Sequence, residues 1–276
     1  MISQEFAFHA PASAAEAVEL LAPHGIDGKA LAGGMSLVPA MNLGIARPTV
    51  VVSLNRVADL EYVEDGGDAV RIGAMTRHAR IESDPLIAEA FPLLARAASV
   101  IGDVQVRNRG TIGGSIAHAD PAADYLPVML ALGAAFRVLG SSGERTIPAG
   151  EFFLGVMATS LETSELLVEI ELPKPPTGAG SAYFRLARLE GSFPLACAAA
   201  VVNGGAPSVA VGGATAAPFR LDLDGSESPE EIEERARSTA ASAFGDVSAT
   251  AGYRQAMAGV YARRAFEAAR DARGTS

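Results

Sequence analysis

The sequence predicts an α+β protein built from more than one packed unit. Its 276 residues are 49% hydrophobic, which is enough chain for two or three packed units. Strand-like and helix-like patterns mix without the regular strand–helix–strand alternation of a doubly wound sheet. Residues 173–180, with the sequence PKPPTGAG, combine helix-breaking prolines with glycines and are typical of a linker. We therefore expect a larger part before this linker and a smaller one after it.

The first segment of the chain shows a helix followed by two buried strands. Apolar residues recur at helical spacing over residues 14–21, and Ser13 is placed to cap that helix. Residues 29–32 are typical of a short buried strand that ends at Gly33-Gly34, and residues 50–54 of a second one. A glycine pair therefore directly follows a predicted strand.

The rest of the chain is expected to alternate strands, helices and turns. Before the linker, the patterns predict a strand at 69–73, a helix over 85–100, a strand at 134–139, a turn at 141–145 and a strand at 166–172. After it, they predict strands near 182–189, 195–202 and 207–213, then helices near 229–243 and 249–272. The second part is thus also α+β.

Composition excludes several classes of function. A net charge of −10 and a pI near 4.9 argue against nucleic acid as a partner. No segment approaches the ~18 consecutive apolar residues that a membrane span needs. One cysteine rules out an internal disulfide and is too few for an iron–sulfur cluster, and the four histidines show no metal-ligand spacing. With no basic and apolar leader at the N-terminus, we expect a cytoplasmic protein without a metal centre of its own.

Two glycine pairs stand beside small hydroxyl residues and are flanked by apolar ones, in Leu31–Leu37 and Thr111–Ala117. Glycine lets backbone N–H groups approach an anion without an intervening Cβ. A single glycine pair is more often only a turn, as we expect for Gly212-Gly213. Two similar segments instead favour one diphosphate held from both sides. Neither segment has the spacing of a Rossmann fingerprint or a P-loop.

The residues around the second glycine pair have competing interpretations. Arg107 and Arg109 fit either a solvated charged face or packing around a cofactor loop. Asp120-Pro121 could start a helix, which would put Asp124 on its first turn and free to accept a hydrogen bond. No Ser-His-Asp, Cys-His or paired-carboxylate constellation can be assembled, so no catalytic residue is assigned.

Three stretches of the chain resemble a known family. Leu31–Leu37, Gln105–Asp124 (QVRNRGTIGGSIAHADPAAD) and Glu165–Pro173 are similar to the FAD-binding medium subunits of molybdenum hydroxylases. That family includes the medium subunit of carbon monoxide dehydrogenase and, more distantly, the flavin domain of xanthine dehydrogenase. The resemblance implies a two-part FAD-binding domain of the PCMH (vanillyl-alcohol-oxidase-like) type over residues 1–175, with subdomains of about 1–57 and 58–175. It implies a C-terminal domain over 176–276.

The resemblance also implies which residues contact the cofactor. The first diphosphate segment would be Ala30, Leu31, Ala32, Gly33, Gly34, Met35, Ser36 and Leu37. The second would be Thr111, Ile112, Gly113, Gly114 and Ser115. Ile101, Asp124, Leu167 and Arg185 would complete the site. Arg185 stands where the family usually has a lysine near the flavin, and Phe193 follows a segment that lacks the family's usual aspartate.

The implied function is electron relay by non-covalently bound FAD. Electrons would arrive from a small [2Fe-2S] subunit, after substrate oxidation on a large molybdenum-cofactor subunit, and leave for NAD, a quinone or oxygen. Both metal cofactors would belong to partners, in a dimer of heterotrimers. Positive charge near the reduced flavin, from Arg185, would stabilise it. The alternatives are a self-sufficient flavin oxidase of related fold and a non-catalytic nucleotide-binding scaffold.

Overall fold

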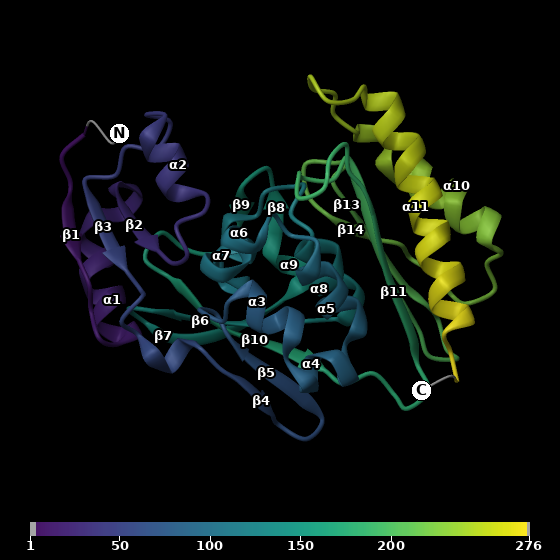
Figure 1. Cartoon of the computed structure of the whole chain (residues 1–276), viewed down its shortest axis with the longest axis horizontal. Coiled ribbons are helices and arrows are strands. Elements are labelled where there is room, and N and C mark those ends of the chain that lie inside the picture. Colours follow the sequence, from purple (N-terminus) through teal and green to yellow (C-terminus); the bar gives the residue numbers. More distant parts are fainter. Residues whose placement is uncertain (1–3, 275–276) are drawn as a thin grey trace.

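The computed structural model describes residues 4–274 and shows three units side by side (Figure 1). The N-terminal unit lies at one end, a central unit combines a sheet with several short helices, and the C-terminal unit lies at the other end. Strands are grouped by unit and not interleaved in one parallel sheet, which confirms the α+β prediction. Within the described residues, no helix is both long and apolar enough to cross a membrane.

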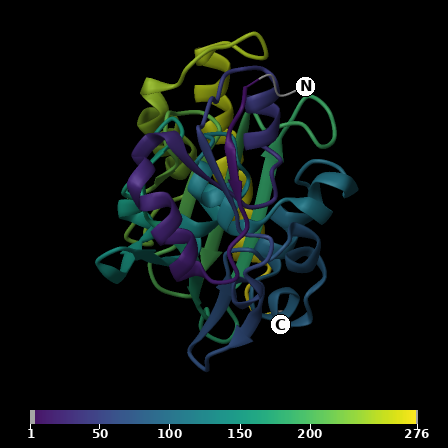
Figure 2. The ribbon, with the colours of Figure 1, turned by 90° about the vertical axis from the view of Figure 1, so that its left-hand side faces the viewer.

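The N-terminal unit is a small parallel sheet with two helices. Its strands are β1 (Ala7–His9), β3 (Val50–Ser53) and β2 (Gly28–Leu31), in that order across the sheet. Helix α1 (Ala14–Leu21) begins at Ser13, whose side chain accepts a hydrogen bond from the amide of Glu16, as predicted. The 3₁₀ segment η1 (Ala22–Asp27), which kinks at Gly25, joins α1 to β2, and α2 (Leu37–Asn42) follows β2. Figure 2 shows this unit facing the viewer.

The central unit holds a five-stranded antiparallel sheet in the order β4-β5-β10-β6-β7. The strands are β4 (Val63–Asp65), β5 (Ala69–Gly73), β10 (Leu166–Pro173), β6 (Ala135–Gly140) and β7 (Gly143–Pro148). A separate hairpin joins β8 (Phe153–Gly155) to β9 (Ala158–Thr159). The register of β10 on β6 shifts between Leu167 and Glu169, which marks a bulge.

Short helices connect and cover these strands. They are η2 (Ala58–Leu60), α3 (His78–Ser83), α4 (Pro85–Ala90), α5 (Pro92–Ser99), α6 (Val104–Arg109), α7 (Ile112–His118), α8 (Tyr125–Leu132) and α9 (Ala149–Phe152). The prediction of one helix over 85–100 was wrong, because the chain breaks at Phe91. Pro92 has no N–H to continue the helix and disfavours helical geometry in the preceding residue.

The C-terminal unit is an antiparallel sheet with two helices on its outer face (Figure 1). The strands are β11 (Gly180–Leu186), β12 (Ala196–Val202), β13 (Ser208–Gly212) and β14 (Phe219–Arg220). The helices are α10 (Pro229–Thr239), the single turn η3 (Ala240–Ser242) and α11 (Ala251–Asp271). Gly213 ends β13 with a φ of +81°, so this glycine pair forms the expected turn.

Strand β12 is buried on both faces and joins the units into one body. Cys197, Ala199 and Val201 pack into the core of the central unit, while the alternating residues pack beneath α11. Helix α8 provides the opposite wall, since all eight of its residues are buried. A helix that is apolar all round needs such burial on every side. The linker therefore separates two parts that share a hydrophobic core.

The contact between β11 and α11 generates a stability prediction. A Cβ on residue 180 would lie 1.9 Å from the carbonyl oxygen of Ala269, so Gly180→Ala must displace the helix. We expect the free energy of unfolding of the full chain, measured in urea, to fall by about 1–3 kcal/mol. Gly150→Ala is the matched control, because a Cβ there meets no atom within 4 Å. Equal unfolding midpoints for the two variants would contradict the assigned packing.

Candidate functional site

The first glycine segment links strand β2 to helix α2 and presents free backbone donors. Strand β2 is held by β3, and the amide of Leu54 donates to Leu31 at 2.9 Å. The chain then turns through Gly34, whose φ is +78°. Between residues 33 and 36, the amides donate to no acceptor among the described residues, and neither does the Ser36 hydroxyl. Several N–H groups on one turn before a helix form a suitable anion site.

The second glycine segment differs from the sequence prediction, since residues 112–118 are helix α7 and not a loop. Thr111 caps this helix and accepts a hydrogen bond from the amide of Gly114 at 3.1 Å. The amide of Ile112 donates to Thr76, and that of Gly113 donates to Ala74. Most amides here are therefore engaged within the protein. The Ser115 hydroxyl has no partner among residues 4–274.

The two segments lie in direct backbone contact. A Cβ on residue 33 would lie 2.2 Å from the carbonyl oxygen of Arg109 and 2.7 Å from the Cα of Gly110. Gly114 faces Ala32, because a Cβ on residue 114 would lie 3.4 Å from the Cβ of Ala32. The sequence prediction that the two glycine pairs converge on one place is thereby supported by the geometry. The free backbone N–H donors lie mainly in the first segment. The second segment allows the two backbones to approach each other closely.

Two polar side chains that the sequence interpretation missed hold these segments together. Asn55 Nδ2 donates to the carbonyl of Ala32 at 3.2 Å, and Arg77 Nη2 donates to Asn55 Oδ1 at 3.0 Å. Arg77 Nη1 donates a short hydrogen bond to the carbonyl of Arg109. One network thus runs from the first segment to the second. Neither residue belongs to a motif. The one sequence feature that could have indicated a role for Asn55 is its position just after a buried strand.

A buried and neutral histidine, His78, lies beside the start of the second glycine segment. The amide of His78 donates to the carbonyl of Gly110 at 3.1 Å, and its Nδ1 lies 3.1 Å from the hydroxyl of Tyr125. Burial, with the charges of Arg77 and Arg107 nearby, lowers the pKa of His78 to about 4. The imidazole is therefore uncharged at neutral pH and serves as packing.

Asp124 is buried and already has protein partners. It lies at the N-cap of α8, so the helix begins later than the expected start at Asp120-Pro121. Its Oδ1 accepts a hydrogen bond from the hydroxyl of Tyr183 at 2.5 Å and lies 3.1 Å from Arg185 Nε. Burial raises the pKa of Asp124 to about 6, although the Arg185 charge and the Tyr183 hydrogen bond oppose that rise.

The remaining predicted contacts lie close to these two groups. Ile101 is half-buried beside Val100, whose carbonyl accepts a hydrogen bond from Arg185 Nη1 at 2.5 Å. Leu167 is buried at the bulge of β10. The carbonyl of its neighbour Val168 accepts a hydrogen bond from the amide of Ala74, and the carbonyl of Ala74 accepts one from the amide of Gly113. Leu167 therefore adjoins the second segment, whereas Ile101 adjoins the Asp124–Arg185 pair.

The family described as the FAD binding domain in molybdopterin dehydrogenase matches residues 4–175. This chain belongs to that family. It is 40% identical to the carbon monoxide dehydrogenase medium chain of Hydrogenophaga pseudoflava, over 98% of both chains. The solved structure of that organism's carbon monoxide dehydrogenase, in a form lacking the Mo-pyranopterin moiety, matches with a TM-score of 0.94 at 39% identity, covering 99% of this chain and 100% of that one.

A further relative widens the range of chemistry in the family. The chain is 37% identical to the nicotine 6-hydroxylase medium subunit of Paenarthrobacter nicotinovorans, over 93% of this chain and 94% of the relative. These relatives are subunits of oxidoreductases, and this chain is likewise an FAD-binding oxidoreductase subunit, as its resemblance implied. The carbon monoxide and nicotine enzymes differ in substrate while sharing this subunit type.

The residues of the site fit the cofactor. A dinucleotide diphosphate needs several hydrogen-bond donors and room for close approach. The first segment provides unpaired amides, and the glycines at 33 and 114 allow the two segments to lie in close contact. No group of three or more metal-ligating side chains occurs between residues 4 and 274.

The buried carboxyl group generates a pH prediction. The folded-state pKa of Asp124, about 6, lies above its ordinary value of 3.8, so the neutral form is favoured on folding. Its stabilising contribution is present below about pH 4 and is lost as the pH rises through about 6. We expect the difference in free energy of unfolding, native chain minus Asp124→Asn, to fall by about 3 kcal/mol from about pH 4 to about pH 7. Parallel pH curves in urea titrations would contradict this assignment.

Proposed function

We propose that this chain is the electron-transfer subunit of a molybdenum hydroxylase complex. It would take electrons from a [2Fe-2S] subunit and pass them to an external acceptor such as NAD, a quinone or oxygen. The observation that carries this proposal is the backbone contact between Gly33 and Arg109, which merges two glycine segments into one cradle. Flavin supplies the chemistry, since it exchanges electrons both singly and in pairs.

The cradle residues would bind FAD through complementary roles. Amides of Gly33, Gly34, Met35 and Ser36 would donate to diphosphate oxygens, and the Ser36 and Ser115 hydroxyls would add two donors. Thr111 would hold the start of α7 in place, because its side chain is bonded to Gly114. Ile101 and Leu167 would provide apolar contact at the two sides of the site.

The chemistry of the one cysteine and the names of the relatives support partner subunits. Cys197 is buried, and burial raises its thiol pKa to about 12, so it is a poor metal ligand. The relatives are named as medium chains or medium subunits. We therefore propose a large molybdenum-cofactor subunit and a small [2Fe-2S] subunit as partners, in a cytoplasmic dimer of heterotrimers. Substrate identity would be determined by the large subunit.

The test is to purify the native complex through a tag on this chain and to compare it with the isolated chain. We expect FAD, molybdenum and iron in the complex, and FAD without substrate turnover in the isolated chain. Reduction of the FAD by substrate should require both partner subunits, since electrons would enter through the clusters.

Other outcomes of this purification identify the alternatives. Turnover of a small substrate by the isolated yellow chain would show a self-sufficient flavin oxidase. A colourless chain that does not take up added FAD would show a scaffold. Recovery of FAD without iron or molybdenum partners from native extracts would contradict the relay.

A further inference from the structure

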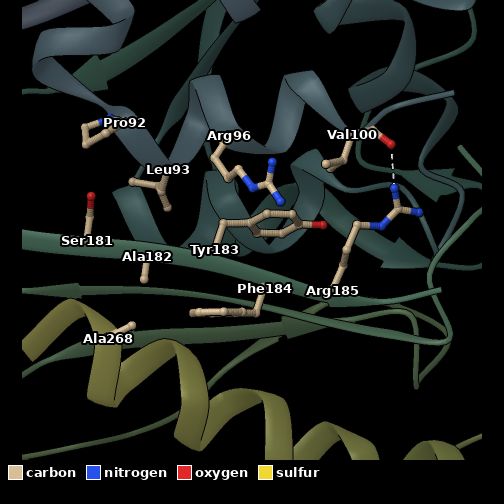
Figure 3. Close-up of a pocket in the computed structure, with 10 residues that line it drawn as sticks. All are labelled: Pro92, Leu93, Arg96, Val100, Ser181, Ala182, Tyr183, Phe184, Arg185 and Ala268. Carbon is tan, nitrogen blue, oxygen red and sulfur yellow. Dashed lines mark hydrogen bonds between the residues drawn. The ribbon is translucent and has the colours of Figure 1, made fainter. Parts of the chain in front are cut away.

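The central unit buries two carboxyl groups within the described residues, and each lies beside an arginine. Asp124 faces Arg185, which Figure 3 shows with its hydrogen bond to Val100. Glu169 of β10 is 4% exposed, and its Oε2 lies 3.1 Å from Nη2 of Arg137 on β6. A carboxylate taken out of water needs such a partner, because its desolvation is costly. Glu169 belongs to neither glycine segment, so its burial requires a separate explanation.

A tyrosine hydroxyl also binds this carboxylate. Tyr62 Oη donates a hydrogen bond to Glu169 Oε2 at 2.5 Å. Burial, together with the nearby carboxylate, raises the pKa of Tyr62 to about 12, so the hydroxyl remains a donor at neutral pH. Tyr62 lies between η2 and β4, whereas Glu169 lies on β10, the middle strand of the sheet. The bond therefore joins the edge of the central sheet to its middle strand.

Gly73 allows the tyrosine to reach across strand β5. In the sheet register, Gly73 is the partner of Glu169. A Cβ on residue 73 would lie 2.8 Å from Cδ1 of Tyr62 and 2.4 Å from the carbonyl oxygen of Leu60. The tyrosine ring thus lies where the side chain of another residue would stand. The bond to Glu169 therefore depends on a glycine at this position.

The backbone of Tyr62 holds the turn of residues 74–76, which follows β5. Its carbonyl accepts a hydrogen bond from the hydroxyl of Thr76 at 2.9 Å. At the other end of the turn, the amide of Ala74 donates to the carbonyl of Val168 at 3.0 Å. Val168 directly precedes the buried glutamate. The bond between the tyrosine and the glutamate therefore closes a ring of contacts that passes through the turn.

The same turn supports the start of the second glycine segment. The carbonyl of Thr76 accepts a hydrogen bond from the amide of Ile112 at 3.0 Å, and that of Ala74 accepts one from the amide of Gly113 at 2.9 Å. A Cβ on residue 113 would lie 2.4 Å from the Cβ of Ala74, so the segment packs directly on the turn. A shift of the turn must therefore move the second glycine segment relative to the first.

We propose that Tyr62 and Glu169 are positioning residues that, through the turn of residues 74–76, hold the second glycine segment at the distance from the first that FAD binding requires. They act through the turn and not by contact with the cofactor. Arg137 balances the charge of the carboxylate and keeps it in place. The effect on FAD rests on the proposed function of the glycine segments, whereas the ring of hydrogen bonds rests on the contacts alone.

Hydrogen exchange of the full chain, after removal of FAD, tests the ring. Tyr62→Phe removes the hydroxyl and keeps the aromatic ring, and Glu169→Gln keeps the shape of the side chain and removes its charge. In both variants, the amides of Ile112 and Gly113 should exchange about three- to tenfold faster than in the native chain, because a hydrogen bond to a charged group is lost or weakened. Unchanged exchange of these amides in a folded Tyr62→Phe chain would overturn the ring.

A matched control separates this bond from the net charge. Glu171 lies two residues farther along β10 and is exposed, and its carboxylate has no partner among residues 4–274. In Glu171→Gln, the amides of Ile112 and Gly113 should exchange at the native rate. An acceleration as large as that of Glu169→Gln would attribute the effect to charge and overturn the proposal. Tyr62→Phe leaves the pair of Glu169 and Arg137 in place, so it tests the ring even where Glu169→Gln does not fold.

Titration with FAD tests the link to the cofactor. The folded Tyr62→Phe chain should bind FAD about three- to tenfold more weakly than the native chain, and Glu171→Gln should bind it with native affinity. A purely structural role would lower the free energy of unfolding without changing the affinity of the molecules that stay folded. Faster exchange with native FAD affinity would therefore overturn the link to the cofactor. Failure of the proposed function would appear differently, as a native chain that takes up no FAD.

Discussion

The site depends on a backbone contact that only glycine permits. Gly33 lies against the carbonyl of Arg109, at a separation where any Cβ would overlap that oxygen. This contact brings a turn after a parallel strand next to the first turn of a helix from another unit. The Asn55–Arg77 network then fixes the two pieces with directed hydrogen bonds. Without that approach, the free amides of the first segment would face solvent as an ordinary turn.

The C-terminal unit extends this arrangement, because it cannot be separated from the central core. Strand β12 supplies alternate residues to both hydrophobic clusters, and Tyr183 of β11 reaches back to Asp124. Buried Arg254 of α11 donates hydrogen bonds to the carbonyls of Leu195 and Gly213 at 2.9 and 2.8 Å. The helix therefore also fixes the residue that precedes β12. Hydrogen bonds to the central unit and to α11 consequently fix both ends of the connection between β11 and β12.

Sequence patterns predicted what depends on local chemistry. The cap at Ser13, the strand at 69–73 and the turn at Gly213 all follow from residue type and spacing. Residue type and spacing could not predict which residues, distant in the sequence, contact one another in the fold. The amides of residues 112 and 113 donate to the carbonyls of Thr76 and Ala74, which belong to no motif. The sequence therefore could not show that these two amides are bonded within the protein and are not free to bind a ligand. The same holds for Arg77, whose role depends on distant carbonyl groups.

The most direct measurement of the central claim is FAD affinity of Gly33→Ala, by titration of the full chain after removal of its cofactor. The added methyl must separate the two segments, and overpacking of this kind typically costs about 1–3 kcal/mol. We predict an affinity about ten- to hundredfold weaker than native, with Gly150→Ala unchanged. Native FAD affinity in a folded Gly33→Ala chain would contradict the account, because the two segments would then not need to meet in order to bind the cofactor.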